Sequence, residues 1–198
     1  MHIFSVAQHG YCASHSRFFW GLRLHLVCTF SGLPIAFALV GAEASEQQTL
    51  PEIFAVDTGL PAQRPGQTLI GDKNYFGAQF EAQLADLGVR HLRPARRGEA
   101  ERPGAELFKP LRQVVEPVNQ TLEGQLDLKR HGGRTVIGVS VSVLQRLLAL
   151  TAAIWHNAEA GAPVLALTDR VRPLTAERQP RLDDGLAGLT AARVGRRT

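Results

Sequence analysis

The sequence predicts an α/β fold, because short apolar segments typical of strands alternate with amphipathic segments typical of helices. Hydrophobic residues make up 44% of the 198 residues and charged residues 20%, as in globular proteins and unlike disordered or fibrous ones. A chain of this length forms one hydrophobic core of ordinary size, so two large domains are not expected.

The charge and the cysteine content narrow the classes of function. Lys and Arg number 22 against 18 Asp and Glu, which permits a nucleic-acid partner without requiring one. Cys12 and Cys28 have no metal-ligand or disulfide-framework spacing, and the N-terminus has no basic segment followed by an apolar one. We therefore expect a reduced, cytoplasmic protein without a signal peptide or a structural zinc site.

The first predicted element is a β-hairpin with arms near residues 17–29 and 34–41. Apolar residues alternate with other residues along both arms, and this period of two is typical of strands. Residues 26–42 carry no charge, which raises the alternative of a membrane span, but turn residues at 31–34 interrupt them. The hairpin is the preferred interpretation, and no membrane partner is expected.

Helices and short strands alternate in the segment that follows. Ser45 is a suitable N-cap for the first of these helices, and Gly88 is a suitable stop for the second. The expected elements are a helix over 46–56, a strand at 69–70, a helix over 76–87 and a strand over 89–94.

Two longer helices are predicted in the second half of the chain. A polar, arginine-rich loop at 95–110 precedes a helix over 111–126, in which Pro117 should produce a kink. An apolar helix over 135–157 has Arg146 as its only charge, and we interpret it as a packed core helix rather than a membrane helix.

The composition changes after this helix. Residues 158–198 are rich in Ala, Arg, Gly, Pro and Asp and contain no aromatic residue. We expect residues 1–157 to form the folded domain and residues 158–198 to form a divergent, poorly ordered tail.

Two acids stand at positions typical of a metal-dependent site. Asp72 ends a strand, at the sheet edge where α/β folds commonly bind ligands, and Glu116 lies in a later helix. Carboxylates are the ligands that Mg²⁺ prefers, and two such ions clamp a phosphoryl transfer. Taken in isolation, Asp72 is more often a turn residue, and Glu116 is more often a surface acid paired with Arg112.

Several segments, taken in order, resemble the catalytic region of bacterial insertion-sequence DDE transposases. The ordered set is more specific than any one segment, and the resemblance extends over roughly residues 10–157. The segments are 10–26, 32–34, 71–75, 111–116 and 124–135.

The resemblance implies an RNase H-like mixed sheet flanked by helices, with Asp72 as the second catalytic acid and Glu116 as the third. It also implies Mg²⁺ or Mn²⁺ as cofactor. The family's first acid lies on a central strand that precedes the segment beginning at Gly10, and none of the residues before Gly10 is an acid. We therefore expect a domain truncated at its N-terminus, without that strand and with unpaired edges on its neighbours.

The family signature around the third acid is only partly present. Arg112 and Glu116 fit its spacing, whereas Lys109 stands at the position of a Tyr and Glu123 at the position of a Lys that contacts DNA. An acid at that position would repel phosphate, and Pro117 disturbs the same helix. Both departures favour impaired activity.

Basic residues near the two acids are the candidate DNA contacts, because phosphate contacts position a duplex. The arginines between residues 90 and 102 could hold the DNA backbone, although a solvated basic loop is nearly as good an interpretation. The expected DNA-binding residues are Arg96, Arg97, Lys109, Arg112, Lys129 and Arg130.

The expected function is DNA transposition by metal-dependent strand cleavage and strand transfer, in a chain that we expect to be inactive because one acid is absent. The alternative is a non-catalytic DNA-binding or regulatory protein that interferes with an intact transposase. The expected partners are transposon ends and target DNA, together with a second copy of the chain or an intact relative.

Overall fold

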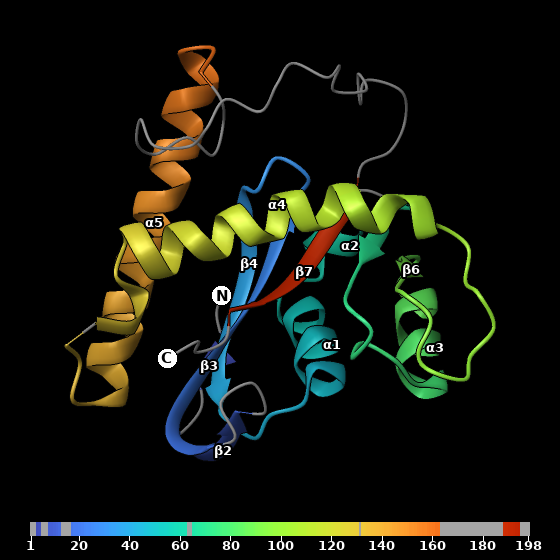
Figure 1. Cartoon of the computed structure of the whole chain (residues 1–198), viewed down its shortest axis with the longest axis horizontal. Helices are drawn as coiled ribbons and strands as arrows, with labels where there is room; N and C mark the ends of the chain where they lie inside the picture. The colour runs from blue at the N-terminus through green and yellow to red at the C-terminus, as the bar shows by residue number, and fades with distance from the viewer. Residues whose placement is uncertain are drawn as a thin grey trace.

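A mixed seven-stranded sheet with helices on both faces forms the centre of the computed structural model (Figure 1). The structure describes residues 3–4, 8–12, 17–62, 65–130, 132–162 and 188–194. The strands are β1 (Ile3–Phe4), β2 (Gln8–Cys12), β3 (Arg17–Thr29), β4 (Pro34–Gly41), β5 (Thr68–Ile70), β6 (Arg90–Leu92) and β7 (Gly188–Val194). Their order is β1-β4-β3-β7-β5-β6, and β2 pairs with β3.

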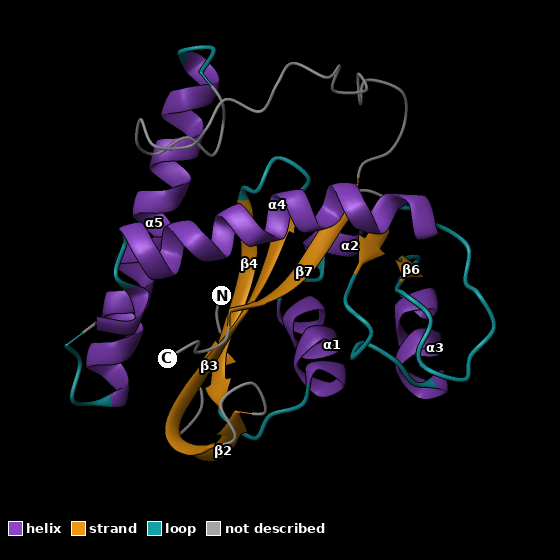
Figure 2. Cartoon of the chain, viewed as in Figure 1, coloured by secondary structure: helices purple, strands orange, loops and turns teal. Residues whose placement is uncertain are grey.

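After the first four strands, helices and strands are interspersed along the chain, and the helices cover both faces of the sheet (Figure 2). They are α1 (Glu46–Val56), α2 (Gly59–Ala62), α3 (Ala78–Asp86), α4 (Phe108–Gln120) and α5 (Val136–Glu159), with short 3-10 helices η2 (Ala105–Leu107) and η4 (Leu128–Arg130) and a π-helix η3 (Thr121–Gln125). This arrangement confirms the α/β class predicted from the sequence.

The predicted hairpin is present, because β3 and β4 pair in antiparallel register through residue pairs such as Leu24 and Leu39. Its turn is closed by backbone hydrogen bonds from Gly32 N to Thr29 O (2.9 Å) and from Thr29 N to Leu33 O (3.0 Å). Gly32 has a φ of 80°, a conformation that favours glycine over residues with a side chain.

Alternation along β3 and β4 divides their side chains between two cores. One core packs α1 and α3 against the sheet and includes Val27, Ala38, Phe54 and Leu84. The other packs α4, η3 and α5 against the opposite face and is built from Leu24, Leu26, Cys28, Phe37, Leu39, Val118, Leu122, Val143, Leu147, Leu150 and Ile154. The sheet is therefore the middle layer of three, with a layer of helices on each face.

The remaining helices agree with the sequence to within a few residues. Ser45 caps α1, because its hydroxyl accepts a hydrogen bond from Gln48 N at 3.2 Å. Pro117 lies inside α4 without ending it, and the helix continues to Gln120 before it changes to the π-helix η3. The predicted helix therefore changes from α-helix to the wider π-helix a few residues after Pro117.

The tail contains an element that the sequence does not predict. Gly188–Val194 forms β7 in the middle of the sheet, antiparallel to β3 and parallel to β5. The expectation of unpaired edges on these two strands is therefore wrong, because β7 pairs with both. Gly188, Ala191 and Ala192 weaken the strand signal of this segment, so the two flanking strands decide its conformation. Residues 163–187 and 195–198 lie outside the described part of the chain.

One described helix, α5, has the length and the apolar composition needed to cross a bilayer. One face of it packs into the second core through Val143, Leu147, Leu150 and Ile154. That packing buries one side of the helix, whereas much of the opposite surface is exposed.

Candidate active site at the carboxyl end of β5

The first candidate residue, Asp72, lies directly beyond the end of β5 with its side chain exposed. Its Oδ1 accepts a hydrogen bond from Asn74 N at 2.6 Å, and its carbonyl oxygen accepts one from Tyr75 N at 3.2 Å. Gly71 before it donates its N–H to Leu92 O of β6 at 3.0 Å. Asp72 therefore has the turn-forming contacts that the sequence offers as the alternative to a metal role.

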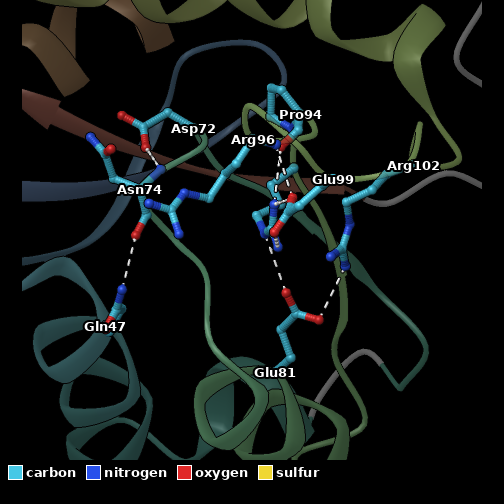
Figure 3. Close-up of polar contacts among 9 residues, drawn as sticks. Gln47, Asp72, Asn74, Glu81, Pro94, Arg96, Glu99 and Arg102 are labelled. Carbon is cyan, nitrogen blue, oxygen red and sulfur yellow. Dashed lines mark hydrogen bonds and ion pairs between the residues drawn. The ribbon is translucent and has the colours of Figure 1, made fainter.

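Close packing fixes the position of this turn. A Cβ added to Gly71 would lie 3.0 Å from the ring of Tyr75, which is itself 1% exposed. Gln47 of α1 donates its Nε2 to Asn74 O at 3.3 Å (Figure 3). The turn that carries Asp72 is thus held at the sheet edge by the packing of Gly71 against buried Tyr75 and by a contact from α1.

Strand register decides which face of the sheet Asp72 belongs to. Ile70 pairs with Thr190 of β7, and Thr190 pairs with Cys28 of β3. Cys28 belongs to the core that α4 covers. Side chains alternate between the two faces along a strand, and Asp72 follows Ile70 by two residues. Asp72 therefore belongs to the same face as Ile70, which is the face that α4 covers.

The second candidate, Glu116, lies in α4 and is exposed. Val118, two residues later, is 1% exposed and packs into the core under the helix. Residues two apart project to nearly opposite sides of an α-helix, so Glu116 projects away from the packed face. The side of α4 that meets the sheet therefore carries Val118 and not Glu116.

The donor groups that the structure describes near these two acids do not form a metal site. Within the described parts of the chain, no three His, Cys, Asp or Glu side chains come together as a group that could hold a metal ion. A hard divalent cation needs several oxygen ligands, and exposed Asp72 and Glu116 do not supply such a set. The described residues therefore do not fit a metal centre as they stand.

The predicted DNA contact Arg96 lies beside Asp72. Its guanidinium carbon stands 3.6 Å from the ring centre of Phe76, and its side chain extends toward the turn that carries Asp72 and Asn74 (Figure 3). Stacking on a ring orients a guanidinium without neutralising its charge. Arg96 is exposed, so this oriented charge faces solvent at the sheet edge.

The loop that carries Arg96 is held by the buried arginine Arg93. Arg93, with 4% of its side chain exposed, donates to Glu99 through Nη1 (2.6 Å) and Nη2 (3.0 Å) and to Glu81 through Nε (3.2 Å). Arg102 Nη2 donates to the other oxygen of Glu81 at 3.1 Å (Figure 3). Arg93 and Arg102 therefore act as internal ion-pair partners of Glu81.

These contacts lower the pKa values of both acids. The hydrogen bonds from Arg93 and then from Arg96 N lower the pKa of Glu99 to about 2. Partial burial acts to raise the pKa of Glu81, but the hydrogen bonds and charges of Arg102 and Arg93 outweigh it and lower the value. Both carboxylates are ionised at neutral pH, so the loop is held by charge-assisted hydrogen bonds.

The other predicted DNA contacts differ in their surroundings. Arg97 and Arg130 are exposed. Lys129 Nζ pairs with Glu123 Oε2 at 2.8 Å, so the acid expected to repel phosphate is neutralised within the protein. The side chains of Lys109 and Arg112 lie outside the described part of the structure.

The sequence offered no signal for the Arg93 cluster. Glu81 and Glu99 lie 12 and 6 residues from Arg93, and neither separation is a helical or strand neighbour spacing. Only the fold brings α3, the end of β6 and the following loop together.

Comparison with known families gives one match: the family model described as "Transposase DDE domain" matches residues 2–152. No curated protein and no solved structure matches the chain.

Proposed function

The chain belongs to the family of transposases with a DDE domain, and from this premise we propose that it binds DNA at the carboxyl end of β5 without cleaving it. Membership of the family supports transposition as the general function and DNA as the substrate. Family chemistry uses a divalent metal for strand cleavage and strand transfer, and we infer that Mg²⁺ or Mn²⁺ would serve that chemistry in an intact member.

The main support for the absence of cleavage is that β7 contains no acid. This strand lies between β3 and β5, and Ala192 pairs with Leu26, a member of the core under α4. Ala192 is two residues beyond Thr190, as Asp72 is two residues beyond Ile70. An acid at position 192 would be level with Asp72 on the same face, but the residue is alanine.

DNA binding is supported by the charges that the fold leaves exposed. Arg96 is oriented by Phe76 beside Asp72, and Arg97 follows it in the same loop. Guanidinium groups suit phosphate oxygens in geometry and charge. We infer a salt-sensitive, sequence-tolerant contact with the DNA backbone, in the cytoplasm where transposases act.

The regulatory alternative loses part of its support. The regulatory interpretation assumed unpaired strand edges that could pair with an intact transposase. In the structure β7 pairs with those edges of β3 and β5. Competition for DNA through the loop containing Arg96 is the form of interference that remains consistent with the exposed charges.

The test combines binding and cleavage in one preparation. Purified full-length protein is titrated onto a labelled duplex over a range of salt concentrations, and then incubated with supercoiled plasmid and Mn²⁺. We expect binding that weakens with salt and becomes weaker again in Arg96→Ala, while an Arg134→Ala control, which changes an exposed arginine elsewhere, binds like the wild type. Nicking of the plasmid that disappears in Asp72→Ala would contradict the proposal.

A further inference from the structure

We propose that an apolar stripe on α5 is a docking surface for the same helix of a second copy of this chain. The stripe is a row of side chains along the helix beside the row that enters the core, and its member Leu144 also packs against that core. Its members are Ile137, Val141, Leu144, Leu148, Thr151 and Trp155.

Four members of the α5 stripe are apolar side chains that are exposed, whereas Leu144 and Thr151 are partly buried. The exposed fractions are 77% for Ile137, 48% for Val141, 70% for Leu148 and 66% for Trp155. Monomeric proteins rarely expose a continuous row of large apolar side chains, and such rows are typical of interaction surfaces. Among the described residues, this is the densest group of exposed large hydrophobic side chains.

The spacing of the α5 stripe indicates a helical partner. Successive members are separated by four, three, four, three and four residues, which is the spacing of the a and d positions in a coiled coil. This row lies on the helix beside the core-facing row of Val143, Leu147, Leu150 and Ile154, so both rows can be buried at once.

The charges on α5 favour a second copy over a membrane surface. Arg146 is the only Lys, Arg, Asp or Glu before Glu159, and it donates Nε to Leu126 O (2.7 Å) and Nη1 to Ser142 O (2.9 Å). Two copies of α5 can therefore meet without like charges in contact. A helix lying on a membrane surface normally carries several Lys or Arg residues on its polar face, and α5 has none there apart from this internally bonded arginine.

The size of the α5 stripe sets the expected strength of association. The row from Ile137 to Trp155 is about 27 Å long at 1.5 Å per residue. A Trp buries roughly 150–250 Å² in a contact, so Trp155 and the three other exposed members supply part of the ~800 Å² that each partner buries in a stable complex. We expect a reversible dimer that forms in the micromolar range.

The experiment is sedimentation velocity of the full-length protein, without DNA, from about 1 to 100 μM, which brackets that range. Wild type should move from monomer to dimer across the series, and Leu148→Glu should raise the dissociation constant at least ~10-fold, since each copy loses a buried leucine. Ala149→Glu is the matched control, because it adds the same charge to the neighbouring exposed residue on another side of the helix. It should dimerise like the wild type.

A second variant and a vesicle assay distinguish the other outcomes. Ile137→Glu lies at the far end of the α5 stripe and should weaken the dimer as Leu148→Glu does, with unchanged circular dichroism in both. A wild type that stays monomeric at every concentration, or equal effects of Leu148→Glu and Ala149→Glu, would overturn the proposal. Binding to neutral lipid vesicles that Leu148→Glu abolishes, in place of dimerisation, would overturn it too. None of these results depends on DNA binding or cleavage.

Discussion

Arg93 shows at the scale of one residue how a buried charge orders a functional loop. It joins Glu81 of α3 to Glu99 of the loop, and the backbone N of Arg96 adds a bond to Glu99 at 2.9 Å. Removing one ion-pair partner leaves the remaining charges unpaired, which lowers the free energy of unfolding. This loss is smaller when the remaining charges are exposed to solvent. Glu81 and Glu99 are about a third exposed, which limits the cost.

We expect Arg93→Ala to lower the free energy of unfolding by about 1–3 kcal/mol, as measured by urea denaturation. Arg90→Ala is the control, because Arg90 is exposed and should change stability by no more than about 0.5 kcal/mol. Equal effects of the two substitutions would mean that the Arg93 cluster does not hold the loop. DNA binding should weaken in Arg93→Ala because Arg96 loses its support.

His91 gives the protein a defined response to pH. Burial lowers its pKa from 6.5 to about 4, an effect that the nearby charge of Glu81 only partly opposes. Its ring meets Phe80 edge to face at 5.3 Å between centroids. The unfolded chain takes up a proton near pH 6.5 and the folded protein does not until about pH 4, so protonation favours unfolding in that window.

The melting temperature should therefore fall as the pH is lowered from 6.5 toward 4, and His91→Phe should remove part of this fall. His156→Phe, at an exposed site on α5, is the control and should leave the slope unchanged. Glu99 contributes a loss of stability only at lower pH, as the pH falls toward its lowered pKa of about 2. A wild type and a His91→Phe variant with identical slopes above pH 4.5 would refute the assignment.

At the scale of elements, alternation and capping predict the hairpin and the helices but not β7. Apolar residues alternate with other residues along both arms of the hairpin, and Ser45 is an N-cap residue that marks the start of α1. Both signals can be found in the local sequence. β7 has no comparable signal, because its conformation depends on the edges of β3 and β5 that flank it. The same reasoning explains why the Arg93 cluster was not predicted.

The register of β7 can be tested with the native thiol of Cys28. Thr190 pairs with Cys28 across the antiparallel strands, a spacing that a disulfide can bridge with a small adjustment. Thr190→Cys, in a Cys12→Ser background, should form an intramolecular disulfide under a mild oxidant. The reaction should be slow, because burial raises the pKa of the Cys28 thiol to about 12.

Ala191→Cys is the matched control for this cross-link. Position 191 pairs with Val27 and belongs to the opposite phase of the strand, so it should not form the bond. Mass spectrometry of the non-reduced protein distinguishes the two variants. A disulfide in Ala191→Cys but not in Thr190→Cys would show that β7 is shifted by one residue.

At the scale of the whole molecule, the sheet is continuous because β7 joins its two parts. The sequence predicts unpaired strand edges where a central strand is missing, and β7 pairs with β3 on one side and with β5 on the other. The sequence does predict the family, the position of Asp72 at a strand end and Glu116 in a helix. Catalytic roles for these two acids stay predictions.

The central claim is that the edge at β5 belongs to a transposase domain and lacks one carboxylate level with Asp72. The most direct measurement is Mn²⁺ affinity by calorimetric titration of wild type, Ala192→Asp and the isosteric control Ala192→Asn. We expect Ala192→Asp to bind Mn²⁺ at least ~10-fold more tightly than Ala192→Asn, and to lose that gain when combined with Asp72→Asn, because affinity rises with the number of carboxylate ligands. Equal affinities in folded Ala192→Asp and Ala192→Asn would contradict the account.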